Sequence, residues 1–151
     1  MLRRGEAEFV VIDHALDWRD VTTHALGREE YVAVESVIYR TRDNVYLDHD
    51  HEDHATHWFF RDQPEAPPYR RSYMGDVYGI LDGVAHGLGR AVVSRHLIGP
   101  DSGLRIMGEF ELRTVDVVLH RYGQCRGSRL HAAALETLLE RCPAYLDASS
   151  G

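Results

Sequence analysis

Met74-Gly75-Asp76-Val77-Tyr78-Gly79-Ile80-Leu81-Asp82-Gly83-Val84-Ala85-His86-Gly87-Leu88-Gly89-Arg90-Ala91-Val92-Val93-Ser94 is the stretch that decides the fold of this chain. Its apolar residues recur at i, i+3, i+4, i+7 and i+8 between Val77 and Leu88, which is the spacing of an amphipathic helix. Asp76 can cap the start of this helix, and Gly87 or Gly89 can end it. The apolar run 91–93 follows at once and predicts a strand, so the whole stretch is typical of a parallel βαβ unit.

Apolar and β-branched runs elsewhere in the chain predict further strands. These runs are residues 9–12, 31–34, 45–47, 70–74 and 115–120. The rings of Trp58-Phe59-Phe60 indicate a helix after a polar loop, with Asp53 as its N-cap and the proline-rich segment 63–68 as its end. A last helix is expected from Ser128 to Pro143, and we expect the following side chains to point inward: Leu130, Ala134, Leu135, Leu138 and Leu139. Residues 17–27 show neither the helical nor the strand periodicity, so we assign no element to them.

The composition of the 151-residue chain, with 44% hydrophobic and 27% charged residues, is that of a globular protein of one domain or two small lobes. A formal net charge of −7 repels phosphate, so the chain is a poor candidate for direct contact with DNA. The N-terminal residues 1–6 lack the apolar run of a secretory signal, and no apolar stretch approaches the roughly 20 residues of a membrane span. Cys125 and Cys142 are therefore expected to be free thiols.

The stretch 74–97 resembles the effector-binding domain of LysR-type transcriptional regulators, in which a helix reading V-x-x-G-x-G runs into an apolar strand. Ser94 stands where that family usually has a proline. Three further segments occur in the order of the family: 3–12 resembles a strand entry, 26–36 the strand leading to the hinge, and 117–121 the C-terminal strand before the helix from Ser128. The resemblance covers nearly all of the chain.

This resemblance implies an α/β fold of the type 2 periplasmic-binding-protein-like class, with two lobes and mixed, mainly parallel sheets. Lobe I would hold about residues 1–38 and 114–151, and lobe II about residues 39–113. Lobe I would be incomplete, because the first strand, helix and strand of the family domain find no counterpart in this sequence. The family's winged helix-turn-helix is likewise missing, so DNA would be reached only through a domain that the sequence lacks.

The function that the resemblance implies is that of a cytoplasmic bacterial sensor without enzymatic activity and without a cofactor. A small organic effector would bind in the cleft between the lobes, and the domain would form a homodimer or tetramer with no membrane partner. The residues expected to contact the effector are Ser36, Asp48, His49, His54, Thr56, Met74 and Ser94. For each of them, a capping or surface role is the alternative. Asp76 is expected to cap its helix, and Arg70 and Arg71 to form a solvated pair.

The segment 48–57 supports a second hypothesis, because it holds four histidines and four carboxylates within ten residues. Imidazole and carboxylate are good ligands for zinc or nickel, and His51, His54 and His57 would share one face of a helix. A metal-binding or metal-sensing module is therefore the alternative function, and a solvated loop with a capped helix start is the simpler interpretation. A third hypothesis, a metal-assisted hydrolase, has little support, because the sequence contains no G-x-S-x-G, P-loop or H-E-x-x-H motif.

Overall fold

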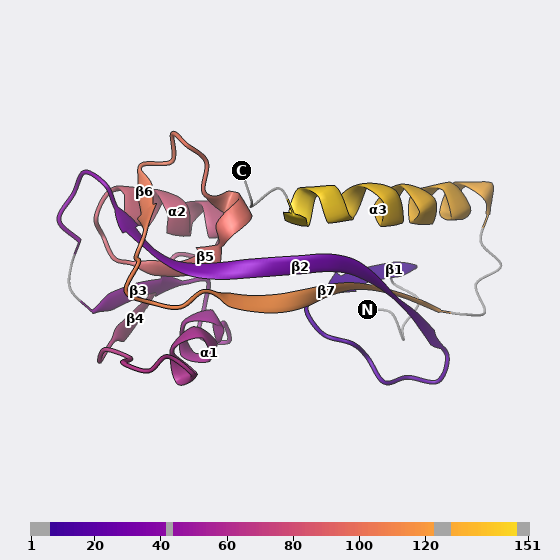
Figure 1. Ribbon diagram of the computed structural model, residues 1–151, viewed down its shortest axis with the longest axis horizontal. Helices are drawn as coiled ribbons and strands as arrows, with labels where there is room; N and C mark the ends of the chain where they lie inside the picture. Colours follow the sequence, from indigo (N-terminus) through magenta and orange to yellow (C-terminus); the bar gives the residue numbers. More distant parts are fainter. Residues whose placement is uncertain (1–6, 42–43, 123–127, 148–151) are drawn as a thin grey trace. The chain divides into compact units, whose positions relative to one another are not determined.

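A computed structural model describes residues 7–41, 44–122 and 128–147 of the chain (Figure 1). The elements follow one another as β1 Phe9–Ile12, β2 Val21–Ser36, β3 Val45–Asp48, α1 Ala55–Arg61, β4 Arg70–Tyr73, α2 Val77–Ala85, β5 Ala91–Ser94, a 3-10 turn Arg95–Leu97, β6 Leu104–Ile106, β7 Arg113–Tyr122 and α3 Arg129–Asp147. The α/β class is confirmed, and so is each expected strand and helix. Cys142 is a free thiol, whereas Cys125 and residues 1–6 lie outside the described residues.

The sheets are mixed, but the balance of strand directions differs from the mainly parallel sheets that we expected. One sheet has the order β1-β7-β2-β5, with β6 also paired to β2, and the β1–β7, β2–β5 and β2–β6 pairings are antiparallel. Parallel pairing among the described strands is found between β3 and β4 and at the bridge between Tyr46 and Arg90. The reason is that the βαβ crossovers are confined to residues 45–94, and the rest of the chain returns along neighbouring strands.

The parallel part of the fold is built by two successive crossovers. β3 and β4 pair in parallel after the chain passes through α1. The chain then returns through α2 to place Arg90 on the other side of β3, where the Leu47 amide donates to the Arg90 carbonyl at 2.7 Å and the Arg90 amide donates to the Val45 carbonyl at 2.8 Å. The expected strand–helix–glycine–strand unit is therefore present, with β3 lying between the two strands that α2 joins.

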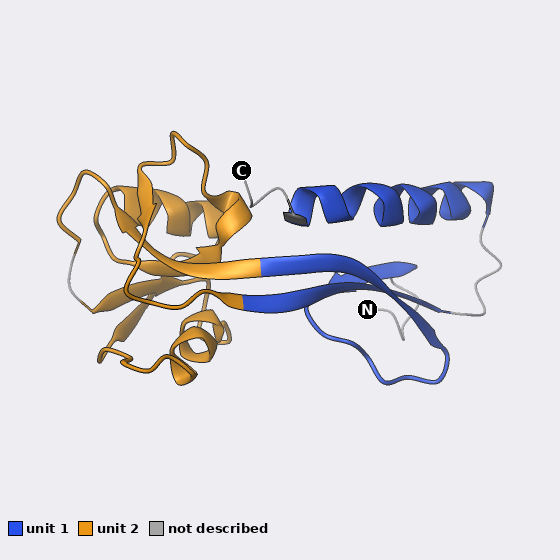
Figure 2. Ribbon diagram, in the orientation of Figure 1, with its two compact units in different colours: residues 1–29, 114–151 blue, residues 30–113 orange. Residues whose placement is uncertain are grey.

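The chain divides into two compact units, which are residues 1–29 with 114–151 (unit 1) and residues 30–113 (unit 2) (Figure 2). Residues 30–38, which we assigned to lobe I, lie in unit 2. The physical reason is strand pairing, since Tyr31–Val34 pair with β5 and Val34–Ser36 pair with β6, and both of these strands belong to unit 2.

β2 is much longer than the strand expected over 31–34, because it begins at Val21 and includes most of the unassigned residues 17–27. Its first half carries Thr22, Thr23 and His24 and has no clear apolar alternation. That half is a strand because it belongs to the same sheet as β7, which is about a hundred residues away in the sequence, so a local pattern cannot reveal it.

Unit 1 has an apolar core between its strands and α3. Leu26, Val117 and Leu119 are buried there, and the α3 residues packed against them are Leu135, Leu138, Leu139, Cys142 and Leu146. α3 therefore continues to Asp147 through Pro143, although we expected Pro143 to end it, because the burial of Leu146 offsets the hydrogen bond that proline removes. Leu130 is 79% exposed rather than inward, since His131 occupies the inward position of the first turn.

Unit 2 has two apolar clusters, one associated with each helix. Val32, Val34, Ala91 and Val93 are buried with Ile80 and Val84 of α2. Ala33 and Val92 are buried with Tyr46 and with Phe59 and Phe60 of α1. Because successive residues of a strand point to opposite faces, this two-sided cover explains the continuous apolar runs of β2 and β5. No helix in the described part of the chain has both the length and the apolar character that a membrane crossing requires.

Candidate functional site

The carboxyl ends of the parallel strands of unit 2 define one edge of the fold. β3 ends at Asp48, β4 at Tyr73 and β5 at Ser94, and these ends lie on the same side because β3 runs parallel to β4 and to the start of β5. The loops that lead into α1 and α2 leave from here. We call this set of strand ends and loops the carboxyl edge, which is the place where parallel α/β sheets generally bind ligands.

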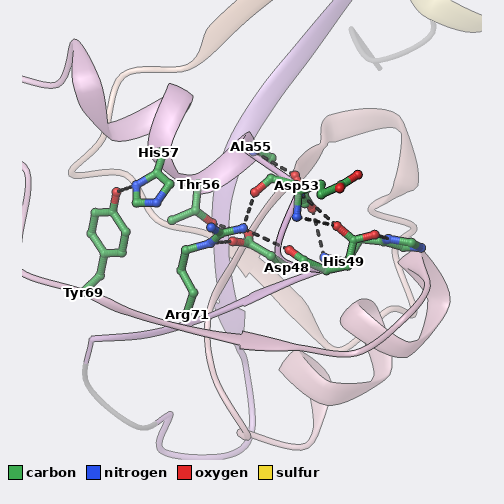
Figure 3. A network of polar contacts seen from close by, with 10 residues as sticks. Asp48, His49, Asp53, Ala55, Thr56, His57, Tyr69 and Arg71 are labelled. Carbon is green, nitrogen blue, oxygen red and sulfur yellow. Dashed lines mark hydrogen bonds and ion pairs between the residues drawn. The ribbon is translucent and has the colours of Figure 1, made fainter.

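A buried ion pair lies at the centre of the carboxyl edge (Figure 3). The Asp48 side chain is 1% exposed, and its Oδ1 accepts a hydrogen bond of 2.5 Å from the Thr56 hydroxyl. Its Oδ2 pairs with the guanidinium of Arg71, whose side chain is 11% exposed. Burial raises the pKa of Asp48, although the hydrogen bonds from Thr56 and Arg71 act in the opposite direction. Burial also opposes the charge of Arg71, but Asp48 outweighs it and holds the pKa of Arg71 above its ordinary value.

Arg71 also organises the loop that joins β3 to α1. Its Nη2 donates to the carbonyl oxygens of Asp53 and Asp50, the latter at 3.1 Å. The Asp53 carboxylate accepts from the His49 amide at 2.9 Å and from the Ala55 amide at 2.8 Å. One guanidinium and one carboxylate therefore tie this loop to the start of α1, as Figure 3 shows.

Asp50 closes the outer part of the same loop. Its Oδ1 accepts from the amides of Glu52 at 2.8 Å and Asp53 at 3.0 Å, and its Oδ2 lies 2.8 Å from Nδ1 of His49. The hydrogen bonds from His49 and from the Glu52 amide hold the pKa of Asp50 below its ordinary value.

The start of α1 differs from our expectation. We placed Asp53 at the N-cap, but the N-cap is His54, whose side chain makes no capping hydrogen bond. Asp53 precedes the cap, and Thr56 is the second residue of the helix. The reason is tertiary: the bond from Thr56 to Asp48 and the bond from Arg71 to the Asp53 carbonyl determine where the helix begins.

The structure brings six of the seven expected effector contacts to the carboxyl edge, but in different environments. Asp48 and Thr56 are buried in the ion-pair network, whereas His49 and His54 are exposed. Met74 is half-buried and packs against the apolar cluster that contains Ile80 and Val84 of α2. Ser94 is 4% exposed, and its hydroxyl lies 2.6 Å from Nδ1 of His96.

Ser36 lies at the opposite edge of unit 2. β2 runs antiparallel to β5, so the end of β2 is near the start of β5 rather than near Ser94. The Ser36 hydroxyl donates to the Ala85 carbonyl at 2.8 Å and accepts from the amides of Ile38 and Tyr39. These bonds join the end of α2 to the turn after β2, which gives Ser36 a structural role.

Arg71 is the residue that the sequence analysis misjudged, because we expected it to be solvated. Arg70 and Arg71 alternate across the strand, and only Arg71 reaches the buried Asp48. One signal was present in the sequence: an aspartate that ends the apolar strand Val45-Tyr46-Leu47 is poorly solvated and favours a cation nearby.

The histidines of segment 48–57 make separate contacts. The His51 ring lies against Tyr73 with a centroid distance of 4.1 Å, and Nδ1 of His57 lies 2.5 Å from the Tyr69 hydroxyl. His54 is the N-cap of α1. Within residues 7–41, 44–122 and 128–147, no three His, Cys, Asp or Glu side chains are grouped as a metal site would require. The structure therefore does not gather His51, His54 and His57 into one ligand set.

Two α/β units joined by two passages of the chain define the periplasmic-binding-protein-like class of fold. No family model and no curated protein matches the sequence. The regulatory domain of CcmR from Synechocystis PCC6803, in complex with 2-PG, superposes with a TM-score of 0.71 at 15% identity, over 92% of this chain and 75% of that domain.

Two further solved structures give similar matches. LysG from Corynebacterium glutamicum, an LTTR (LysR-type transcriptional regulator) with bound effector Arg, has a TM-score of 0.73 at 17% identity, over 93% of this chain and 52% of LysG. ArgP from Mycobacterium tuberculosis has a TM-score of 0.75 at 17% identity, over 99% of this chain and 54% of ArgP. The chain thus spans about half the length of these two proteins, and it has the fold of LysR-type regulatory domains.

Proposed function

We propose that this chain is the effector-binding regulatory domain of a LysR-type transcriptional regulator and that it is not an enzyme. The observation that carries the proposal is the carboxyl edge of unit 2, where three parallel strand ends and the loops into two helices meet in a fold shared with such domains. A small organic molecule is the class of ligand that this kind of edge usually binds. Among the structural neighbours, CcmR is seen with 2-PG and LysG with Arg.

The residues at this edge would have two kinds of role in binding. His49 and His54 are exposed and can offer imidazole nitrogens to a ligand. Ser94 with His96, and Met74, lie at the neighbouring strand ends. Asp48, Thr56 and Arg71 are already satisfied by one another, so we assign them the positioning of the loop that carries His49 and His54.

Regulation would follow from unequal affinity of the effector for two conformations, since only a difference in affinity can shift their populations. In this proposal, units 1 and 2 are the two lobes of one sensor, which works in the cytoplasm as a homodimer or tetramer. A DNA-binding domain outside this chain would contact the promoter, because an acidic domain with a net charge of −7 is repelled by phosphate.

A thermal-shift screen followed by titration calorimetry tests the proposal. The screen should contain amino acids, aromatic acids and small phosphorylated acids, and a true ligand raises Tm in proportion to the logarithm of its concentration. We expect His54→Ala to weaken the binding of the confirmed compound by about tenfold, which is the loss of one good hydrogen bond.

His86→Ala is the matched control, because His86 is also an exposed histidine but lies at the C-cap of α2. The affinity of the control should stay within about twofold of the parent. A screen in which no compound raises Tm at millimolar concentration, or equal losses in the two variants, would count against a ligand site at the carboxyl edge.

A further inference from the structure

The short helix α1 is held by polar contacts at both of its ends. At its start, the Thr56 hydroxyl donates to the buried Asp48 of the carboxyl edge. Near its end, the guanidinium of Arg113 donates to the Trp58 carbonyl at 2.9 Å and pairs with Asp62 at 2.7 Å. The same guanidinium lies over the Trp58 ring, 4.4 Å from its centroid. A contact of this kind adds about 1 kcal/mol or more when it is partly desolvated.

Trp58 also contacts the strand by which the chain enters unit 2. The ring of Tyr31 meets the ring of Trp58 edge to face, with centroids 5.5 Å apart and planes at 76°. Tyr31 is the second residue of unit 2, and Arg113 is its last residue. One side chain of α1 therefore touches both points at which the chain passes into and out of unit 2. We call Tyr31, Trp58 and Arg113 the Trp58 clamp.

We propose that α1 couples the carboxyl edge to both chain passages through the Trp58 clamp. A helix of seven residues is internally hydrogen-bonded and moves as one piece, so a displacement at Thr56 is carried to Trp58. Tyr31 and Arg113 must then adjust together, because both of them pack on the same indole ring. The regulatory meaning of this coupling rests on the proposed function, whereas the mechanical coupling can be measured without any effector.

The opposing interpretation is that the clamp is ordinary packing that stabilises unit 2 without connecting its parts. Coupling differs from packing in being reciprocal: a change at the carboxyl edge must be felt at the passages, and a change at the passages must be felt at the edge. α2 offers the comparison. Its start is capped by the neighbouring residue Asp76, and its buried residues Ile80 and Val84 belong to a different apolar cluster from that of α1.

Hydrogen–deuterium exchange on the full chain tests the proposal in both directions. Thr56→Val removes the hydroxyl that reaches Asp48 and keeps the shape of the side chain. We expect it to raise exchange roughly threefold or more in residues 49–61 and also in residues 30–34 and 113–117. Arg113→Met removes the guanidinium, and we expect it to raise exchange in residues 49–54 by a similar factor.

Three control variants separate coupling from general loss of stability. Thr56→Ser and Arg113→Lys keep the hydroxyl and the charge, so their exchange should stay near that of the parent. Asp76→Ala weakens α2 instead and should leave residues 113–117 unchanged. The proposal is overturned if Thr56→Val raises exchange only in 49–61, or if Asp76→Ala raises it at 113–117 as strongly.

A measurement on the unaltered protein covers the case in which a variant does not fold. Native-state exchange in increasing urea reports the opening free energy of each segment and its urea dependence. Coupled segments open as one unit. A plot of opening free energy against urea concentration should therefore give one common line for residues 30–34, 49–61 and 113–117. Separate lines would overturn the proposal, and neither result depends on whether an effector has been found.

Discussion

The two helices of unit 2 are formed for different reasons. α2 carries its own signals: Asp76 accepts a hydrogen bond from the Gly79 amide at 2.9 Å, its apolar residues face the core, and Gly87 follows it with a φ of +75°. The side chain of His54, the N-cap of α1, makes no capping hydrogen bond, and the helix has only seven residues, which is too short to be stable in isolation. Phe59 and Phe60 pack it into an apolar cluster, and polar groups hold its ends, Asp48 at one end and Arg113 at the other.

The comparison teaches that a local signal makes a helix a fixed part of the scaffold, whereas a helix held by distant polar groups responds to those groups. The residues that hold α1 belong to the carboxyl edge and to the chain passage at Arg113. A change at either place can reach α1, whereas α2 depends on its own cap and core. The predictions below test this difference, from the largest expected effect to the smallest.

Asp48→Ala should be the most destabilising change, because it leaves the Arg71 guanidinium buried without its counter-ion and the Thr56 hydroxyl without its acceptor. Breaking a buried ion pair costs about 3–5 kcal/mol, which should appear in urea unfolding followed by circular dichroism. Asp48→Asn keeps an acceptor for Thr56 and should lose less. A loss below about 1 kcal/mol for the alanine variant would mean that Arg71 turns to solvent and that α1 does not depend on this pair.

Gly87→Ala should follow, because it combines two penalties at the end of α2. A Cβ at this position would lie 2.7 Å from Cβ of Tyr39, and the backbone has a φ of +75°. Gly75→Ala is the matched control, since its φ is +82° but nothing lies within 4 Å of the added atom. We expect about 1 kcal/mol for Gly75→Ala from the backbone and about 2–4 kcal/mol for Gly87→Ala from backbone and clash together. Equal losses would show that Tyr39 moves away without cost.

Asp76→Ala should cost about 1 kcal/mol, because it removes the side-chain acceptor for the Gly79 amide. Asp76→Asn can still accept this hydrogen bond and should be nearly neutral. Differential scanning calorimetry of the two variants gives the comparison. If both variants lose the same stability, the charge of Asp76 matters rather than the cap, and α2 would be less locally determined than the structure indicates.

The smallest effect concerns the pH dependence of the two aspartates of the carboxyl edge. The pKa of Asp50 is lowered from 3.8 by His49 and the Glu52 amide, so its stabilisation is present above pH 3.8 and is lost as pH falls through the lower folded value. The pKa of Asp48 is raised from 3.8 by burial, so its ionisation weakens the fold as pH rises through the higher folded value.

Urea unfolding between about pH 2 and pH 6 measures both dependences. The stability of the parent minus that of Asp50→Asn should rise with pH, and the same difference for Asp48→Asn should fall. The two Asn variants serve as controls for each other, because they remove the same charge from buried and exposed positions. If the two stability differences change with pH in the same direction, the environments assigned to Asp48 and Asp50 are contradicted.

The structure places most of the expected contact residues together, and their contact with an effector stays a prediction. Six of the seven expected contacts lie at the carboxyl edge, because residues that follow parallel strands must share one end of the sheet. Ser36 does not, because the antiparallel direction of β2 could not be inferred from its own residues. Arg71 was overlooked because its partner, Asp48, is 23 residues away in the sequence.

By itself, the sequence determined those parts of this protein whose cause is local. These are the helix 77–85 with its Asp76 cap and its glycine end, the short apolar strands, and the α/β order of elements, which follow from side-chain periodicity and from the backbone freedom of glycine. The tertiary structure alone decided the length of β2, the continuation of α3 through Pro143, the start of α1 and the burial of Asp48 with Arg71. Each of these depends on partners distant in the sequence, whose packing and charge outweigh local preference.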